Sequence, residues 1–184
     1  GLVDRRRGLD FHTRSGILKA AWDDPWIEMD FPSQPVSELE PADGLIEALD
    51  VEPRFVGRND ADWLVEVHSE RQVRDLQPDM GGLRRAGARG VIVTSASESA
   101  HHDFISRFFA PAVGVDEDPV TGSAHCSLGP YWAQRLGKGE LVGYQASERG
   151  GVVRVSPRGD RTLLAGRAVT VLQCRLEVAW PRLP

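Results

Sequence analysis

The sequence predicts an α+β fold in which a mostly antiparallel, curved sheet is wrapped around one central helix. Apolar side chains recur near helical spacing between residues 120 and 136, at Ala124, Leu128, Tyr131, Trp132 and Leu136. From Leu141 onward, short alternating segments are separated by turns, which is typical of neighbouring antiparallel strands. The chain has 184 residues and is 41% hydrophobic, enough for a core without disulfides or metals.

The first third of the chain predicts a hairpin and a short helix. Leu9–Ala21 alternates loosely and Trp26–Pro32 alternates clearly, and the turn signal Asp23-Asp24-Pro25 lies between them. Residues 33–41 are proline-rich and without a period, so we expect a linker there. A short helix is expected to follow, ending near Leu49.

The middle of the chain predicts two strands, two helices and two more strands. The β-branched run Gly90–Thr94 is expected to be buried, and Ser69 is expected to cap the first of the helices. In chain order these elements are Phe55–Arg58, Trp63–Val67, Ser69–Leu76, Met80–Ala86, Gly90–Thr94 and Asp103–Pro111.

The central helix is expected to end at Gly137-Lys138-Gly139. Turns at residues 157–160 and at Gly166 separate several strands of the remaining tail. The strands expected there are Leu141–Gln145, Gly151–Val155, Thr162–Ala165, Ala168–Leu172 and Arg175–Ala179.

Composition excludes several classes of function. The net charge of −5 argues against a general nucleic-acid binder and against an anionic membrane surface. No apolar run is long enough to cross a bilayer, and no signal-peptide pattern opens the sequence, so we expect a cytoplasmic protein. The two cysteines, Cys126 and Cys174, have no metal-ligand spacing, and we expect no metal.

The stretch from Asp116 to Ser123 is the best candidate for chemistry. Asp118 precedes Pro119, a pattern that predicts a helix start with Asp118 as its cap. Thr121, Gly122 and Ser123 have small side chains, so a ligand could approach their N–H groups. Because a helix N-terminus carries partial positive charge, these groups could hold a substrate carboxylate beside an ionisable acid.

Several islands of sequence resemble the PhzF-like phenazine-biosynthesis family, which is related in fold to diaminopimelate epimerase. They lie in order along nearly the whole chain: Thr13–Gly16, Met29–Pro32, Asp103–Pro111, Gly114–His125, Pro130–Trp132, Gln145–Gly151 and Leu164–Ala168. The resemblance implies a cofactor-independent isomerase or epimerase acting on a small carboxylate metabolite. It also implies a catalytic role for Asp118 and substrate contacts from Thr121, Gly122 and Ser123.

The resemblance mainly covers the second half of the family's fold. We therefore interpret residues 1–35 as closing strands of a first half and residues 36–184 as a complete second α+β domain. The glutamate base and the Gly-His-Ala-Thr-type segment of the first half are not found in this sequence. We expect this chain to be inactive alone, and unpaired edges of its hairpin to favour a homodimer. The alternative is a non-catalytic anion-binding or interaction module.

Other residues leave alternatives open. Cys126 could be a reactive thiol or a core residue, and His125 could be a base or a packed residue. Arg107 could pair with an acid of residues 116–118 or reach solvent. Residues Gln145, Ser147, Arg149 and Gly150-Gly151 form a second polar cluster that could face the cleft.

Overall fold

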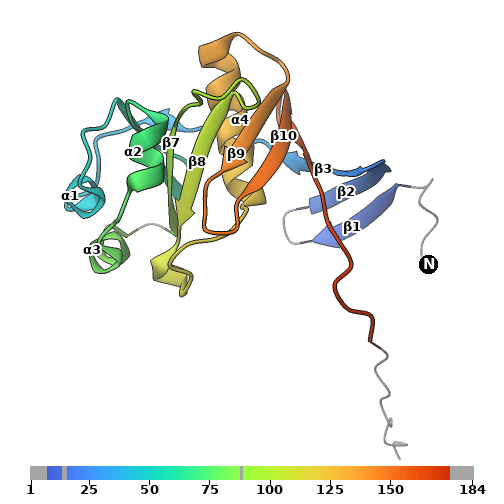
Figure 1. Ribbon diagram of the computed structural model, residues 1–184, viewed down its shortest axis with the longest axis horizontal. Helices are drawn as coiled ribbons and strands as arrows, with labels where there is room; N and C mark the ends of the chain where they lie inside the picture. Colours follow the sequence, from blue (N-terminus) through green and yellow to red (C-terminus); the bar gives the residue numbers. More distant parts are fainter. Residues whose placement is uncertain (1–7, 14–15, 88, 175–184) are drawn as a thin grey trace, which may run out of the picture.

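The computed structural model describes residues 8–13, 16–87 and 89–174 (Figure 1). Its strands are β1 (Leu9–Thr13), β2 (Gly16–Asp23), β3 (Trp26–Pro32), β4 (Ser37–Glu38), β5 (Phe55–Arg58), β6 (Asp62–Glu66), β7 (Gly90–Ala96), β8 (Phe104–Phe109), β9 (Leu141–Gln145), β10 (Gly151–Arg158) and β11 (Arg161–Gly166). Its helices are α1 (Leu45–Leu49), α2 (Glu70–Asp75), α3 (Met80–Arg85), the 3₁₀ turn η1 (Pro111–Val113) and α4 (Gly122–Leu136).

All the strands join one 11-stranded sheet in the order β1-β2-β3-β11-β10-β9-β8-β7-β6-β5-β4. Antiparallel pairs predominate, as the alternating tail predicts, but β6 pairs with β7 and β8 pairs with β9 in parallel. The sheet is therefore mixed, and its two edges, β1 and β4, do not meet. The predicted mostly antiparallel sheet with few helices is thus confirmed, whereas its curling around one central helix stays a prediction.

Alternation along each central strand gives the sheet two buried faces. On β7, Val91 and Val93 belong to the apolar cluster formed with α1, α2 and α3, whereas Ile92 belongs to the cluster formed with α4. Because successive side chains of a strand point to opposite faces, one run of β-branched residues serves both layers. Helices α1–α3 thus cover one face, and α4 lies against β9, β10 and β11 on the other (Figure 1).

Helix α4 has more buried residues than any other described helix, as expected for the central helix predicted between residues 120 and 136. Ala124, Leu128 and Trp132 are at most 2% exposed, and Leu136 at its end is exposed. The linker after β3 runs beside the helix, since the Gln34 N–H donates to the Cys126 carbonyl at 3.0 Å. None of the described helices combines the length and the apolar composition needed to cross a bilayer.

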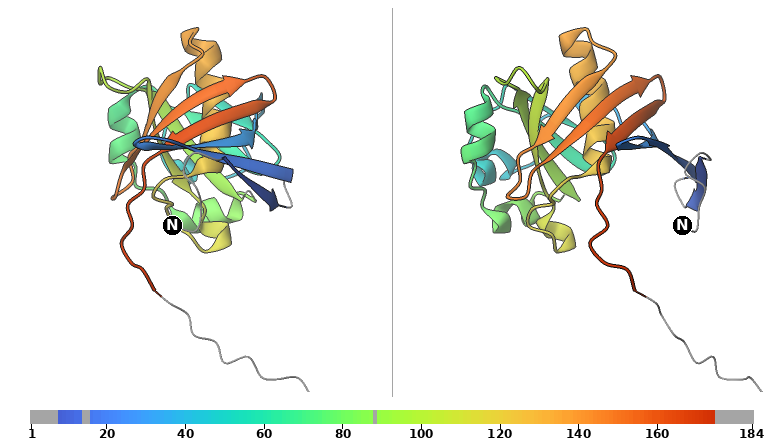
Figure 2. Two further views of the ribbon diagram at one scale, coloured as in Figure 1. Left: turned by 90° about the vertical axis from the view of Figure 1, so that its right-hand side faces the viewer. Right: turned by 45° about the vertical axis from the view of Figure 1, so that its right-hand side comes forward.

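The ends of the chain differ most from the predictions. Leu9–Ala21 forms two strands, β1 and β2, and the predicted hairpin across Asp23–Pro25 is confirmed as β2–β3. The strand expected at Ala168–Leu172 is absent: this segment has no regular structure, leaves the body and exposes Val169 and Val171 (Figure 2). Strand β11 already has β3 and β10 as neighbours, so the alternating segment after it finds no free edge there. The strand expected at 175–179 lies outside the described residues.

Candidate functional site

The acidic loop, defined here as residues 116–121, connects the end of β8 to the first turn of α4. The Asp118 N–H donates to the Phe108 carbonyl at 3.0 Å, which ties the loop to β8. The Thr121 hydroxyl donates a short hydrogen bond to the Asp118 carboxylate. The carboxylate and the helix start are therefore held together by local contacts, as the sequence predicts.

The predicted position of the helix start is wrong by three residues. Thr121, not Asp118, is the N-cap residue of α4, and its side chain makes no capping hydrogen bond. Pro119 lies in the bend before the helix and not in its first turn. The reason is that the Thr121 hydroxyl is engaged by Asp118, and its N–H is engaged by a side chain from β9.

That side chain belongs to Gln145, which is fully buried. Its Oε1 accepts from the Thr121 N–H at 2.8 Å, and its Nε2 donates to the Asp118 carbonyl at 2.6 Å and to the Thr121 hydroxyl at 3.1 Å. Both ends of the Gln145 amide are thus used on two residues of the acidic loop. The sequence placed Gln145 in a polar cluster that could face a cleft, whereas the structure makes it the buried clamp of Asp118 and Thr121.

Ser147, two residues further on, supports the same loop. Its hydroxyl donates to the Pro119 carbonyl at 2.8 Å and accepts from the Gly150 N–H at 3.1 Å. A side chain on Gly151 would place its Cβ 2.3 Å from Val120 Cγ2, so only glycine allows this approach. The segment after β9 is therefore shaped to hold residues 118–121.

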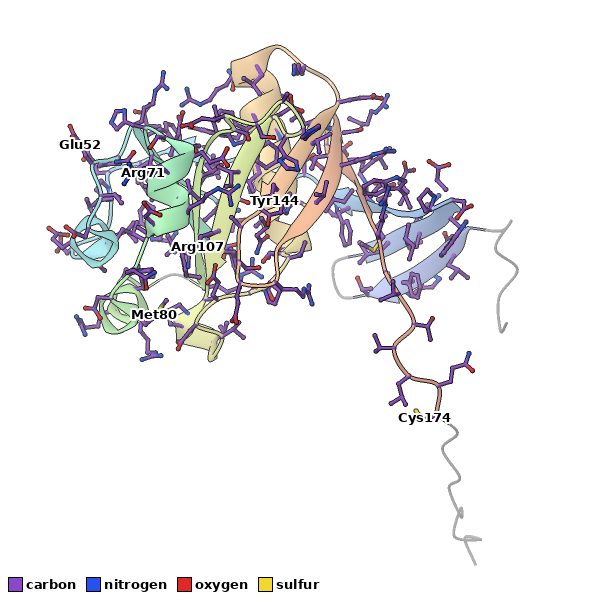
Figure 3. All side chains as sticks on the ribbon, viewed as in Figure 1. Glu52, Arg71, Met80, Arg107, Tyr144 and Cys174 are labelled. Carbon is purple, nitrogen blue, oxygen red and sulfur yellow. The ribbon has the colours of Figure 1, made fainter. Side chains whose placement is uncertain are left out.

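Arg107 resolves an alternative that the sequence left open. Its guanidinium donates to both Glu117 oxygens, at 2.7 and 2.9 Å, and to the Leu76 carbonyl at 2.7 Å. The Arg107 side chain, labelled in Figure 3, is 11% exposed. The acid that Arg107 neutralises is Glu117, so this arginine anchors the loop one residue before Asp118.

Gly122 and Ser123 begin α4 and are both half-buried. A Cβ on Gly122 would meet only Leu164 Cδ1, at 3.9 Å, so no protein atom crowds this side of the helix start. The Ser123 Oγ accepts from Arg89 Nη2 at 3.1 Å, and Arg89 in turn pairs with the buried carboxylate of Asp62. Sequence reasoning missed Arg89 and Asp62, because they lie far from the motif and carry no pattern of their own.

Two hollows lie beside the acidic loop. One, of about 390 Å³, is lined by Glu117, Pro119, Ser147, Glu148 and Arg149. A larger groove, of about 1170 Å³, contacts Val120, Arg149 and Arg167 between the start of β10 and the segment after β11. Asp118, Gly122 and Ser123 line neither hollow, so a pocket shared by these three residues stays a prediction.

The residues just inside α4 are structural. His125 is fully buried, and its Nδ1 donates to the Thr121 carbonyl at 2.7 Å, because a carbonyl can only accept. Burial lowers the pKa of His125 to about 4, and only the backbone hydrogen bond opposes it, so the ring is neutral at pH 7. Burial raises the pKa of the Cys126 thiol to about 12, which contradicts the alternative of a reactive thiol.

Among the described residues, no group of three histidine, cysteine or acidic side chains converges as a metal site would require. The His101-His102 pair lies in the loop before β8, where the His102 ring stacks on Tyr144 at a centroid distance of 5.1 Å.

A family model described as phenazine biosynthesis-like protein matches residues 5–174, most of the chain. This chain belongs to the PhzC-PhzF family. The islands of sequence that resemble the family, from Thr13–Gly16 to Leu164–Ala168, all lie within these matched residues.

Individual members of the PhzC-PhzF family agree with this assignment. An uncharacterised isomerase of Halalkalibacterium halodurans is 50% identical over 175 residues, which are 95% of this chain and 66% of that protein. A crystal structure of a phenazine biosynthesis PhzC/PhzF protein from Clostridium difficile superposes with a TM-score of 0.83 at 32% identity, over 94% of this chain and 66% of the other.

The fold extends beyond the PhzC-PhzF family. A probable proline racemase from Agrobacterium radiobacter has a TM-score of 0.59 at 12% identity, over 96% of this chain and 63% of that chain, a likeness of fold alone. The chain spans about two thirds of the length of the curated relatives it matches. Three of these relatives are named uncharacterised isomerases.

Proposed function

We propose that this chain belongs to a cofactor-independent isomerase or epimerase that moves a proton on a small carboxylate metabolite. The acidic loop and the start of α4 would form one side of its active site. Asp118 is the proton-transfer group in this proposal. The observation that carries it is the fixed position of the Asp118 carboxylate, one bend before the start of α4, in a family with relatives named isomerases.

A group that transfers a proton to or from carbon must be held at a defined distance from that carbon. Asp118 meets this requirement at three points: its N–H bonds to β8, its carbonyl to Gln145, and its carboxylate to Thr121. Glu117 next to it is committed to Arg107. Of these two neighbouring acids, Asp118 is the one left for chemistry.

The substrate carboxylate is proposed to sit at the start of α4, on the N–H groups of Gly122 and Ser123. The 15-residue helix directs the positive end of its dipole to this point, which favours an anion. Removal of a proton from the adjacent carbon would place negative charge next to the same N–H groups. The anion site would then stabilise the charge that develops in the transition state.

Inversion or isomerisation at carbon needs one group to take a proton and another to return one. Asp118 supplies one of them. We propose that the second comes from a region that the relatives have and this chain does not align with, since the chain spans about two thirds of their length. Inversion would then need both sides of the site, whereas Asp118 by itself could still exchange the proton on its own side of the carbon with solvent.

Hydrogen–deuterium exchange on the substrate tests the proposal directly. The intact protein would be incubated in D₂O with a panel of amino- and hydroxy-substituted carboxylates, and deuterium at carbon would be followed by NMR. We expect exchange that Asp118→Asn abolishes, with folding unchanged. Asp116→Asn is the matched control, because Asp116 is exposed in the same loop and forms an ion pair with the exposed Arg84.

Two outcomes count against the proposal. Exchange at the wild-type rate in Asp118→Asn would exclude Asp118 as the proton-transfer group. Carboxylate binding without any exchange would instead support the non-catalytic, anion-binding alternative.

A further inference from the structure

An ion pair lies beside the start of α4, outside the stretch from Asp116 to Ser123. Asp62 is the first residue of β6 and pairs in register with Gly90 of the parallel strand β7. Arg89, the residue before Gly90, therefore lies next to Asp62. Its Nε donates to Asp62 Oδ1 at 2.9 Å, and its Nη2 makes a short hydrogen bond to Oδ2.

The pair has the geometry of a rigid bidentate clamp. The Asp62 side chain is fully buried, whereas that of Arg89 is 42% exposed. The buried carboxylate therefore fixes the guanidinium, while part of the Arg89 side chain remains accessible to solvent. A Cβ on Gly90 would lie 2.3 Å from Phe108 Cζ and 3.1 Å from Asp62 Oδ1. Gly90 thus lets the Phe108 ring and the Asp62 carboxylate approach together, and the Arg89 guanidinium lies 5.9 Å from that ring's centroid.

The clamp determines what the Ser123 hydroxyl can do. Arg89 Nη2 donates to Ser123 Oγ at 3.1 Å, and a guanidinium has no acceptor. The hydroxyl must therefore direct its own proton to a different partner. Without Arg89, the acceptor lone pairs of Ser123 Oγ would be free, and the hydroxyl could rotate and bond to water instead of donating to a ligand.

We propose that Arg89, held by Asp62, is a positioning residue that fixes the Ser123 hydroxyl as a hydrogen-bond donor to the substrate carboxylate. This inference rests on the proposed function, because it assumes that a carboxylate binds at Gly122 and Ser123. It assigns to Arg89 a role exerted through Ser123 and not through direct contact with the anion.

A neighbouring serine provides an internal control. Ser127 lies one turn after Ser123 and accepts from Asn59 Nδ2 at 2.9 Å, the same kind of contact from the β5–β6 turn. Unlike Ser123, Ser127 is fully buried. Its hydrogen bond can therefore stabilise the fold, but its hydroxyl cannot reach a ligand in solvent.

The test is a mutant cycle on carboxylate binding, with anthranilate and carbonate as probes in calorimetric titrations of the intact protein. Asp62→Asn with Arg89→Gln replaces the ion pair by a neutral pair and avoids a buried unpaired charge. We expect this double variant, and Ser123→Ala, each to weaken binding about tenfold. When the neutral pair is added to Ser123→Ala, binding should weaken by less than about a further twofold, because the effects of residues that act through one contact are not additive.

Ser127→Ala should lower the unfolding temperature and leave binding unchanged. Arg85→Gln, which removes an exposed arginine paired with the exposed Asp79, should change neither quantity. Arg89→Lys keeps the charge but not the bidentate geometry, and we expect it to lose more than half of the binding energy that the neutral pair loses.

The outcomes separate this inference from the proposed function. If Ser123→Ala weakens binding and the neutral pair does not, or if the two effects are additive, the role of Arg89 is refuted and the proposed function stands. If the wild-type protein binds neither probe, or Ser123→Ala binds as tightly as wild type, the carboxylate site and this inference fall together.

Discussion

Gln145→Leu is the substitution that most directly tests how the acidic loop is held. Leucine keeps the approximate volume of glutamine but removes both polar atoms of the amide. The Thr121 N–H, the Asp118 carbonyl and the Thr121 hydroxyl would each lose a partner. Because Thr121 is 8% exposed, water cannot readily replace the lost bond to its N–H.

The expected cost follows from these three contacts. An unsatisfied buried donor or acceptor costs about 1–3 kcal/mol, and the partly exposed Asp118 carbonyl can recover some of its loss from water. We therefore expect the free energy of unfolding to fall by about 2–4 kcal/mol. For a chain of this size, about 3 kcal/mol corresponds to a decrease in unfolding temperature of about 6–12 °C.

Thermal unfolding followed by circular dichroism measures this change, and deuterium exchange on substrate measures its effect on Asp118. Since the clamp fixes Asp118, exchange should fall by at least about tenfold at temperatures where the variant is folded. Gln134→Leu is the matched control, because Gln134 lies exposed in the last turns of α4. If the two variants unfold within about 1 °C of each other, Gln145 does not hold the loop as described.

Three further predictions concern pH, thiol chemistry and assembly. The pKa of His125 is about 4 in the folded state, below its ordinary value of 6.5, so the unfolded state binds more protons between these two values. The free energy of unfolding should therefore fall by about 2 kcal/mol from pH 7.5 to 5. Urea titrations of His125→Leu at the two pH values should lack this decrease. Native protein treated with iodoacetamide at pH 8 should be modified at the exposed Cys174 and not at the buried Cys126. Mass spectrometry of the peptides measures this, and rapid modification of Cys126 would contradict its burial. We propose that the open edge at β1, with Phe11 half exposed, favours a homodimer; a monomeric mass by light scattering at micromolar concentration would exclude it.

Local patterns predicted most of the elements because they depend on neighbours in sequence. Helical spacing located α4, and Ser69 caps α2 as predicted by accepting from the Gln72 N–H. The alternating runs located β9 to β11, since side-chain direction alternates in any strand, and the β-branched run Gly90–Thr94 located β7. The same alternation predicted a strand at Ala168–Leu172, and this prediction was wrong, because a strand also needs a free sheet edge with which to pair.

The sequence by itself determined the family, because the islands that resemble it lie in order along nearly the whole chain. It also determined the small residues at the start of α4 and the acid before them, because these lie within eight consecutive positions from Asp116 to Ser123. Only the tertiary structure decided which acid Arg107 neutralises, which residue caps the helix, and that Gln145 and Arg89 hold Thr121 and Ser123. The physical reason is that these contacts join groups 10 to 34 residues apart. Strand order and register decide which distant side chains meet, and neither is written in the local pattern of any one segment.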